Sequence, residues 1–102
     1  MAPATLTDAA TIAVDFEAGR NFTVTLGGNR TLGNPTNVQA GDSGTIYVIQ
    51  DGTGSRTLTL ASNWKPIGGA PTLSTTAAAV DVFSYFARST SAITISYLGA
   101  EG

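Results

Sequence analysis

The sequence predicts a single all-β domain of antiparallel strands, arranged as a small β-sandwich or barrel of jelly-roll or Greek-key type. Three observations predict this class. Threonine, a β-branched residue that favours strands, is the commonest residue of the chain. Short segments alternate between apolar and polar residues with the period of two that is typical of strands. Clusters of Gly, Asn, Asp and Ser separate these segments at regular intervals.

The 102 residues correspond to one domain, because most domains contain ~100–150 residues. We expect residues 1–10, which include Pro3, to form an extended N-terminal arm. Residues 11–102 are expected to form the single β-domain.

The first half of the β-domain is expected to contain three strands. Thr11–Phe16 is the first, and Asn21–Leu26 is the second because it alternates apolar residues with threonines. Gly27-Gly28-Asn29 has the composition of a hairpin turn and leads into a third strand at Arg30–Leu32.

The second half is expected to contain five more strands. Thr45–Gln50 is apolar at consecutive positions, which indicates a strand covered on both faces, and Arg56–Leu60 alternates again. Asn63–Pro66 is a candidate short edge strand, because its proline cannot donate to a ladder. The last hairpin joins Val80–Ala87 to Ile93–Leu98.

Charge and composition exclude several classes of function. Charged residues make up only 12% of the chain, with a net charge of −2, whereas a nucleic-acid partner requires clustered Lys and Arg. Cysteine and histidine are absent, which excludes disulfides, cysteine-based metal sites and a histidine base. No apolar run is long enough to span a membrane and no signal peptide is recognised, so we expect synthesis in a cytoplasm and no membrane partner.

The glycine-rich loop Asp51–Thr57 is interpreted as a structural turn defined by Asp51, Gly52, Gly54 and Arg56. A phosphate-binding loop would instead end in Gly-Lys-Ser/Thr and open a helix. A calcium site would need further carboxylates beside Asp51. We therefore expect a hairpin turn that binds no metal and no cofactor.

The titratable residues predict no catalytic site. The carboxylates are scattered singly, without the convergent pair that a glycosidase needs, and a serine nucleophile would have no histidine base. We expect no enzymatic activity. Arg56 and Asp81 are a candidate structural ion pair.

Aromatic residues are the best candidates for contacts with a partner. Trp64 lies beside Asn63 and Lys65 in a loop-like stretch, where it covers the core or contacts a partner. Tyr47 and Tyr85 lie inside apolar strands and are expected in the core. Further candidate partner contacts lie in the N-terminal arm, at Met1, Pro3 and Leu6.

Several segments of the second half resemble a known family. They are Gln50-Asp51-Gly52-Thr53-Gly54-Ser55-Arg56-Thr57, the pair Trp64-Lys65, Pro71-Thr72-Leu73-Ser74-Thr75, and Ala79-Val80-Asp81-Val82-Phe83-Ser84-Tyr85. From Gly41 to Leu98, and more loosely from Asn21 to Thr36, the chain resembles a β-rich module of tailed-bacteriophage virion proteins. That module occurs in fibre-type tips and in small capsid-associated proteins.

The resemblance implies a structural role in the virion. A short chain without coiled-coil heptads or a baseplate-anchoring domain favours a capsid decoration (cement) protein, which binds the outer shell and stabilises it by mass action. The implied partners are the major capsid protein and other copies of the chain in a homotrimer, at the capsid surface. The alternative is a tail-fibre or adhesin module that binds host-surface glycans through Trp64 and loop Asn and Thr residues.

Overall fold

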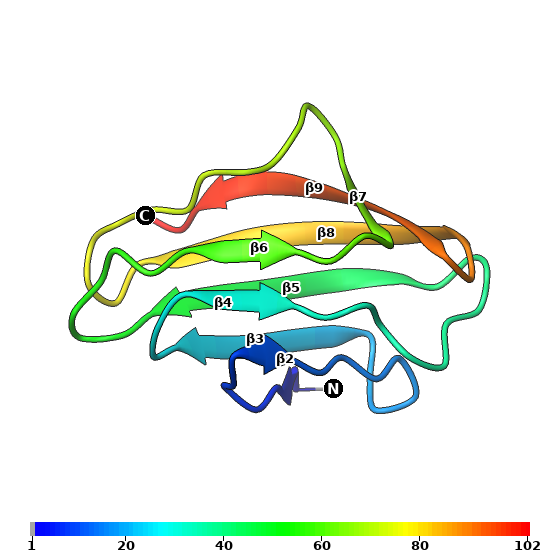
Figure 1. Cartoon of the computed structure of the whole chain (residues 1–102), viewed down its shortest axis with the longest axis horizontal. Coiled ribbons are helices and arrows are strands. Elements are labelled where there is room, and N and C mark those ends of the chain that lie inside the picture. The colour runs from blue at the N-terminus through cyan, green and yellow to red at the C-terminus, as the bar shows by residue number, and fades with distance from the viewer. Residues whose placement is uncertain (1) are drawn as a thin grey trace.

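Two sheets of unequal size make up the computed structural model, which describes residues 2–102 (Figure 1). The six-stranded sheet has the order β1-β3-β5-β8-β9-β7, and the three-stranded sheet has the order β2-β4-β6. No helix occurs among the described residues, so the prediction of an all-β chain is confirmed. The strands are β1 (Ala4–Thr5), β2 (Thr11–Ile12), β3 (Asn21–Leu26), β4 (Arg30–Leu32), β5 (Ser43–Gln50), β6 (Leu58–Leu60), β7 (Trp64–Pro66), β8 (Val80–Ser89) and β9 (Ala92–Ala100).

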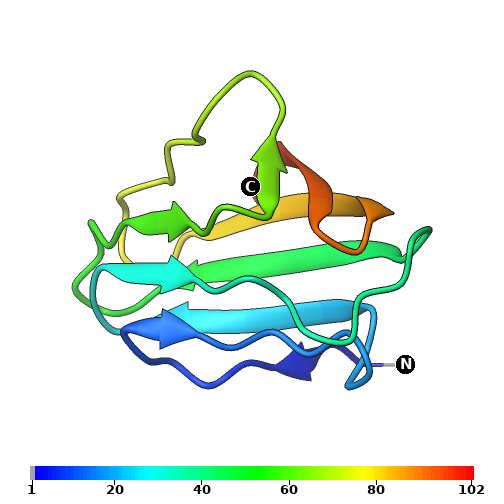
Figure 2. The same cartoon turned by 45° about the vertical axis from the view of Figure 1, so that its right-hand side comes forward.

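The first six strands alternate between the two sheets, so that the chain winds in three coils. Each coil contributes one strand to the large sheet and one to the small sheet: β1 and β2, then β3 and β4, then β5 and β6. Strands of successive coils pair in parallel in both sheets. Figure 2 shows the three strands of the small sheet lying in the same direction, one above another.

A short sequence pattern recurs where each coil passes through the small sheet. Thr-Ile-Ala at 11–13, Thr-Leu-Gly at 31–33 and Thr-Leu-Ala at 59–61 align in register, with threonine beside threonine and the aliphatic residue beside its equivalent. The third position is small in all three segments, and at Gly33 the coils approach closely. A Cβ at Gly33 would lie 3.0 Å from the carbonyl oxygen of Ile12, and the Gly33 N–H donates to that oxygen at 2.9 Å.

Polar side chains in the connections join each coil to the next. Arg30 binds Asp8 with two nitrogens, at 2.8 and 3.0 Å, across 22 residues of sequence. The Asn29 side-chain oxygen accepts the backbone N–H of Thr57 at 3.0 Å, 28 residues further on. The Asn34 side-chain oxygen accepts the backbone N–H of Asn63, 29 residues further on, at 2.8 Å. Side chains that suggest tight turns in the sequence therefore hold neighbouring coils together.

The core lies between the inner faces of the two sheets. The alternation of Asn21–Leu26 is confirmed, since its apolar residues are buried and its threonines are not. The larger buried side chains of the core are Ile12, Val14, Phe16, Phe22, Val24, Leu26, Leu32, Ile46, Val48, Trp64, Phe83, Tyr85, Ile93 and Ile95. They come from both sheets and form one cluster.

The prediction of an antiparallel jelly-roll or Greek-key arrangement is wrong. Only β8 pairs antiparallel, with β5 on one side and β9 on the other, and the pairings among the first six strands are parallel. Gly27-Gly28-Asn29 and the Asp51–Thr57 loop are not hairpin turns, because each carries the chain from the large sheet to the small one. Side-chain alternation is the same for both strand directions, so it could not distinguish them.

Two predictions about the ends of the sheet are confirmed. Residues 80–89 and 92–100 form the expected last hairpin, and Trp64–Pro66 is the expected short strand at the sheet edge.

The segment expected to be an N-terminal arm takes part in the sheet instead. Ala4 and Thr5 pair in parallel with β3, and the N–H of Leu6 donates to Thr23 at 2.8 Å.

Gly44 tests how closely the β2–β3 connection approaches β5. A Cβ at this position would overlap the carbonyl oxygen of Arg20 and lie 2.9 Å from the Tyr85 hydroxyl. We expect Gly44→Ala to lower the free energy of unfolding by about 1–3 kcal/mol, measured by urea denaturation, because backbone must move to accept the methyl group. Gly52→Ala is the matched control, since nothing lies within 4 Å of a Cβ there. Equal stabilities of the two variants would contradict this packing.

Candidate functional site

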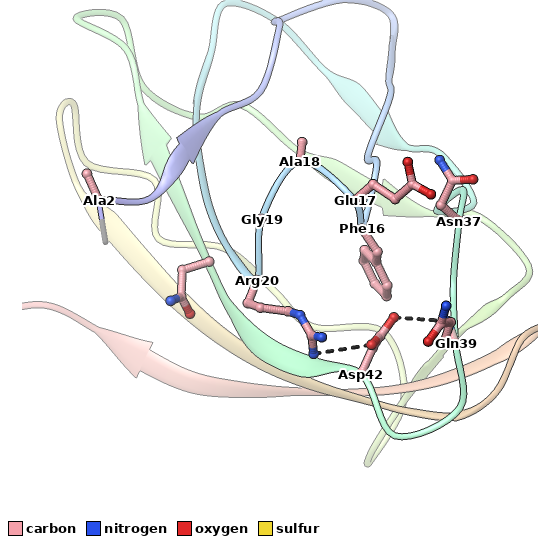
Figure 3. A pocket seen from close by; sticks show the side chains of 10 residues that line it. Ala2, Phe16, Glu17, Ala18, Gly19, Arg20, Asn37, Gln39 and Asp42 are labelled. Carbon is pink, nitrogen blue, oxygen red and sulfur yellow. Dashed lines mark hydrogen bonds and ion pairs between the residues drawn. The ribbon is translucent and has the colours of Figure 1, made fainter.

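The connections from β2 to β3 and from β4 to β5 meet at one end of the molecule and enclose an open pocket. Its volume is about 590 Å³. Figure 3 shows Asp42 between Arg20 and Gln39, with the ring of Phe16 pointing toward Asp42. The lining residues are Ala2, Phe16, Glu17, Ala18, Gly19, Arg20, Asn21, Asn37, Gln39 and Asp42.

Asp15 holds the two connections together through the lining residues Glu17 and Asn37. Its Oδ1 accepts the side-chain N–H of Asn37 at 2.8 Å and the backbone N–H of Glu17 at 2.9 Å. The backbone N–H of Phe16 also donates to Thr36 at 3.0 Å. The hydrogen bond from Asn37, followed by that from Glu17, lowers the pKa of Asp15. Two lining residues of different coils thus share one carboxylate.

Phe16, the aromatic residue of the lining, belongs to an aromatic cluster of the core. Phe16 stacks on Tyr85 with ring centroids 4.9 Å apart and on Phe22 at 6.1 Å. Trp64 meets Phe16 edge-on at 6.2 Å and Tyr85 at 6.1 Å. Such pairs each contribute about 0.5–1.5 kcal/mol beyond the area they bury. The connection that carries Phe16 is therefore anchored to the core by these ring contacts.

Arg20 and Asp42 form the charged side of the pocket. Arg20 Nη1 lies 3.2 Å from Asp42 Oδ1, and the arginine side chain is 59% exposed. The other carboxylate oxygen of Asp42 accepts the backbone N–H of Gln39 at 2.9 Å. Because Asp42 binds through one guanidinium nitrogen, the rest of the Arg20 head group faces the solvent.

Tyr85 fixes the backbone that carries Arg20. Its hydroxyl donates to the Arg20 carbonyl oxygen at 2.6 Å. Burial is the main cause that raises the pKa of Tyr85 to about 12. The phenol therefore stays protonated and keeps this hydrogen bond over the physiological range of pH.

The Asp51 loop, which the sequence singles out, is held by its own polar groups. Asp51 Oδ1 accepts the backbone N–H groups of Thr53 and Gly54, both at 3.0 Å, and its Oδ2 lies 3.0 Å from Arg56. Gly54 has φ = 77°, and a Cβ there would lie 2.5 Å from the Thr75 carbonyl oxygen. Backbone donors that could have held a phosphate are thus already bonded to Asp51.

Two buried polar side chains, Gln50 and Asp81, hold the segments around this loop. Gln50 donates to the carbonyls of Arg56 and Ser74, at 2.9 and 2.8 Å, and accepts the N–H of Arg56. Asp81 accepts the Ser74 hydroxyl at 2.9 Å and the Tyr97 hydroxyl at 2.7 Å. The expected ion pair between Arg56 and Asp81 is therefore wrong, because the partner of Arg56 is Asp51.

The structure does not place Trp64 at the surface. Its side chain is 2% exposed, and its indole N–H donates to the Gly33 carbonyl at 2.9 Å. It therefore covers the core, which was one of the two alternatives, and cannot stack on a sugar. The burial was not evident from the sequence because the neighbouring residues Asn63 and Lys65 are polar. Alternation along an edge strand nevertheless allows a buried residue between two polar ones.

The candidate contacts of the N-terminal segment are dispersed. Pro3 is exposed, whereas Leu6 is half-buried and packs against the core. Met1 lies outside the described residues. No cluster of three or more His, Cys, Asp or Glu side chains that could hold a metal occurs among residues 2–102. No helix in this range is long and apolar enough to cross a membrane.

One family matches nearly the whole β-domain. The model of a family described as "Putative phage tail fibre C-terminal domain" matches residues 7–99. The chain belongs to this family. No curated protein and no solved structure matches it.

Membership of the tail-fibre family establishes a structural role in the phage virion and a location in the virion. It agrees with the resemblance to phage virion modules and fits the tail-fibre alternative better than capsid decoration. The pocket residues escaped the sequence analysis because Phe16, Arg20 and Asp42 carry no motif and meet only through coil stacking. The pairing of Asp15 with Asn37 would have been the one available signal, since both lie in turn-like segments of successive coils.

The Asp51 loop makes the stability of the fold depend on pH in the acidic range. The hydrogen bond from Arg56 is the main cause that lowers the pKa of Asp51 from 3.8 to about 2. The ionised carboxylate therefore stabilises the fold fully above pH ~4, and this contribution is lost as the pH falls through about 2. We expect Asp51→Asn to lower the melting temperature at pH 7. Between pH 4 and pH 2 the melting temperature of this variant should fall less than that of the unchanged chain.

Thermal melts followed by circular dichroism at pH 7, 4, 3 and 2 measure both effects. Glu101→Gln, which removes an exposed carboxylate near the C-terminus, is the control with the same change in charge. If Asp51→Asn and the unchanged chain lost melting temperature in parallel down to pH 2, the assigned role of the carboxylate would be wrong.

Proposed function

We propose that this chain is the host-contacting domain of a phage tail fibre and that it attaches to an uncharged saccharide of the bacterial surface. The saccharide lies in the pocket between the β2–β3 and β4–β5 connections. The observation that carries the proposal is the family match over residues 7–99, together with an open pocket in which polar side chains surround Phe16.

The shape and the groups of the pocket support a saccharide ligand. Small-molecule sites are concave and combine apolar surface with a few convergent polar groups. Phe16 contributes apolar surface at the base, while Arg20, Asn37 and Gln39 surround it with hydrogen-bond donors and acceptors. Sugar hydroxyls both donate and accept hydrogen bonds, so they match amide groups that do the same.

The charges of the pocket favour an uncharged ligand. Asp42 already neutralises Arg20 at 3.2 Å, and Glu17 adds a second carboxylate to the lining. An anionic sugar or a phosphate would meet two carboxylates and one arginine that is already paired. Like charges brought together in this way discriminate against the wrong ligand.

The role proposed is attachment without chemistry. The carboxylates in the lining, Glu17 and Asp42, differ in kind: Asp42 is buried and bonded to Arg20 and to backbone, and Glu17 is exposed. A nucleophile with an adjacent base is not formed by the lining residues. Glycan recognition therefore moves from Trp64, where the sequence suggested it, to the loops around Phe16.

Position on the particle is tested by immunogold microscopy of purified virions with antibodies against this chain. We expect label at the ends of the tail fibres and a low copy number per particle. Label spread over the head in hundreds of copies would overturn the proposal. It would instead support the capsid decoration role and the major capsid protein as partner.

Saccharide attachment is tested with the fluorescently labelled domain and susceptible bacteria. We expect Arg20→Gln and Gln39→Ala each to weaken binding to cells by at least ~10-fold, because each removes hydrogen bonds to the ligand. Neutral oligosaccharides from the host surface should compete, and acidic ones should not.

Lys65→Gln is the matched control for Arg20→Gln, since it removes one positive charge from an exposed residue of the edge strand β7, outside the lining. It should bind cells like the unchanged domain. Equal binding by all three variants would show that the pocket is not the attachment site, whereas competition by acidic sugars alone would refute the uncharged ligand.

A further inference from the structure

A second pocket lies where the connection from β7 to β8 passes the edge of the large sheet. Its base is formed by Pro66, Phe83, Ile95 and Tyr97, from three neighbouring strands, and its wall by residues 67–71 of the connection. Figures 1 and 2 both show this connection looping out at the β7 edge. The volume is about 330 Å³, at the lower end of the ~300–1,000 Å³ range of small-molecule sites. We call it the β7–β9 pocket, and it shares no lining residue with the pocket around Phe16.

Tyr97 gives the β7–β9 pocket an exposed aromatic ring on the core side of the sheet. It pairs across the strands with Phe83, which is buried, so both side chains face the same way. The Tyr97 hydroxyl donates to Asp81 at 2.7 Å, and its ring centroid lies 5.3 Å from that of Phe83. Tyr97 nevertheless stays 38% exposed. The ring is therefore held in place before a ligand arrives, which lowers the cost of binding.

The wall of the β7–β9 pocket combines apolar side chains with open backbone. Ile67 is 68% exposed, and Pro66 and Pro71 are half-buried. Gly68 and Gly69 have φ values of 79° and 95°, a conformation that glycine adopts readily, and nothing lies within 4 Å of a Cβ at either. Two consecutive residues without side chains leave the amide groups of the connection accessible.

The charges around the β7–β9 pocket differ from those of the first pocket, which contains the Arg20–Asp42 pair. Among the described residues, none that lines the β7–β9 pocket is charged. Asp81 is fully buried and bonded to the Tyr97 hydroxyl, and Lys65 lies on the side of β7 opposite to its two neighbours in the strand. An ionic ligand would find no countercharge here, so the pocket suits an uncharged group.

We propose that the β7–β9 pocket binds a sugar residue that carries an apolar substituent, such as the acetyl group of an N-acetylhexosamine or the methyl group of a 6-deoxyhexose. The apolar face of the sugar ring stacks on Tyr97, and the substituent lies against Pro66 and Ile67. The sugar hydroxyls bond to the backbone amides of Gly68 and Gly69, partners that an aliphatic chain would leave unused.

This inference rests on the proposed function, attachment to a surface saccharide, and adds a second site that recognises a different sugar residue. Two sites on one chain bind a surface that presents both sugars more tightly than either site alone.

Binding is measured by NMR on the purified domain labelled at its isoleucine methyl groups. Ile67 and Ile95 line the β7–β9 pocket, whereas Ile12 and Ile46 lie in the core outside it. We expect N-acetylglucosamine or 6-deoxyglucose to shift the two lining signals in a saturable way and to leave the other two unchanged. Glucose should bind at least ~10-fold more weakly, because it lacks the apolar substituent.

Ile67→Ser should weaken this binding by at least ~5-fold, because it removes apolar surface from the wall. Leu98→Ser is the matched control, since Leu98 is 62% exposed, follows Tyr97 in β9 and does not line the pocket. It should bind like the unchanged domain. Circular dichroism checks that both variants fold.

The outcomes separate this proposal from the first pocket. If neither sugar shifted Ile67 at about 50 mM, or if Ile67→Ser and Leu98→Ser bound equally, the β7–β9 pocket would not be a sugar site. Loss of cell binding by Arg20→Gln would still uphold the proposed function in that case. A response of Ile67 to hexanol and to neither sugar would assign the pocket to an aliphatic chain and overturn the proposal. Sugar binding at Ile67 that Arg20→Gln leaves unchanged would support two separate sites.

Discussion

Close stacking of one coil on the next is the constraint on which the rest of this structure depends. Backbone hydrogen bonds join the coils in both sheets, and Gly33, directly after β4, allows the second coil to approach the first closely. Neither sheet could form from one coil alone, because its strands pair only with those of the neighbouring coils and the final hairpin. Asp8, Asn29 and Asn34 extend the same stacking into the connections.

The pocket that we assign to function follows from this arrangement. Connections of successive coils end side by side, so the loops before β3 and β5 form a pocket with polar groups from each. Charged and amide side chains of those connections bind one coil to another.

The sequence predicted much of the local structure and little of the site. Asn21–Leu26, the edge strand at Trp64–Pro66 and the last hairpin could be predicted because alternation and the position of proline are local properties. The burial of Trp64 and of Tyr47 was harder to predict, because a period of two defines two faces of a strand without indicating which face is covered. Trp64 is buried, whereas Tyr47 points outward and is half-buried.

The sequence by itself determined an all-β chain with little charge, no histidine or cysteine, and turns rich in Gly, Asn and Asp. Tertiary structure decided that these turns cross between sheets and that the first six strands pair in parallel, since this pairing joins residues 18 or more positions apart that no local pattern connects. The three Thr-aliphatic-small segments were visible, but their unequal spacing of 20 and 28 residues concealed the repeat. The pocket was decided at the same level, because Phe16, Arg20 and Asp42 come together only when the coils stack.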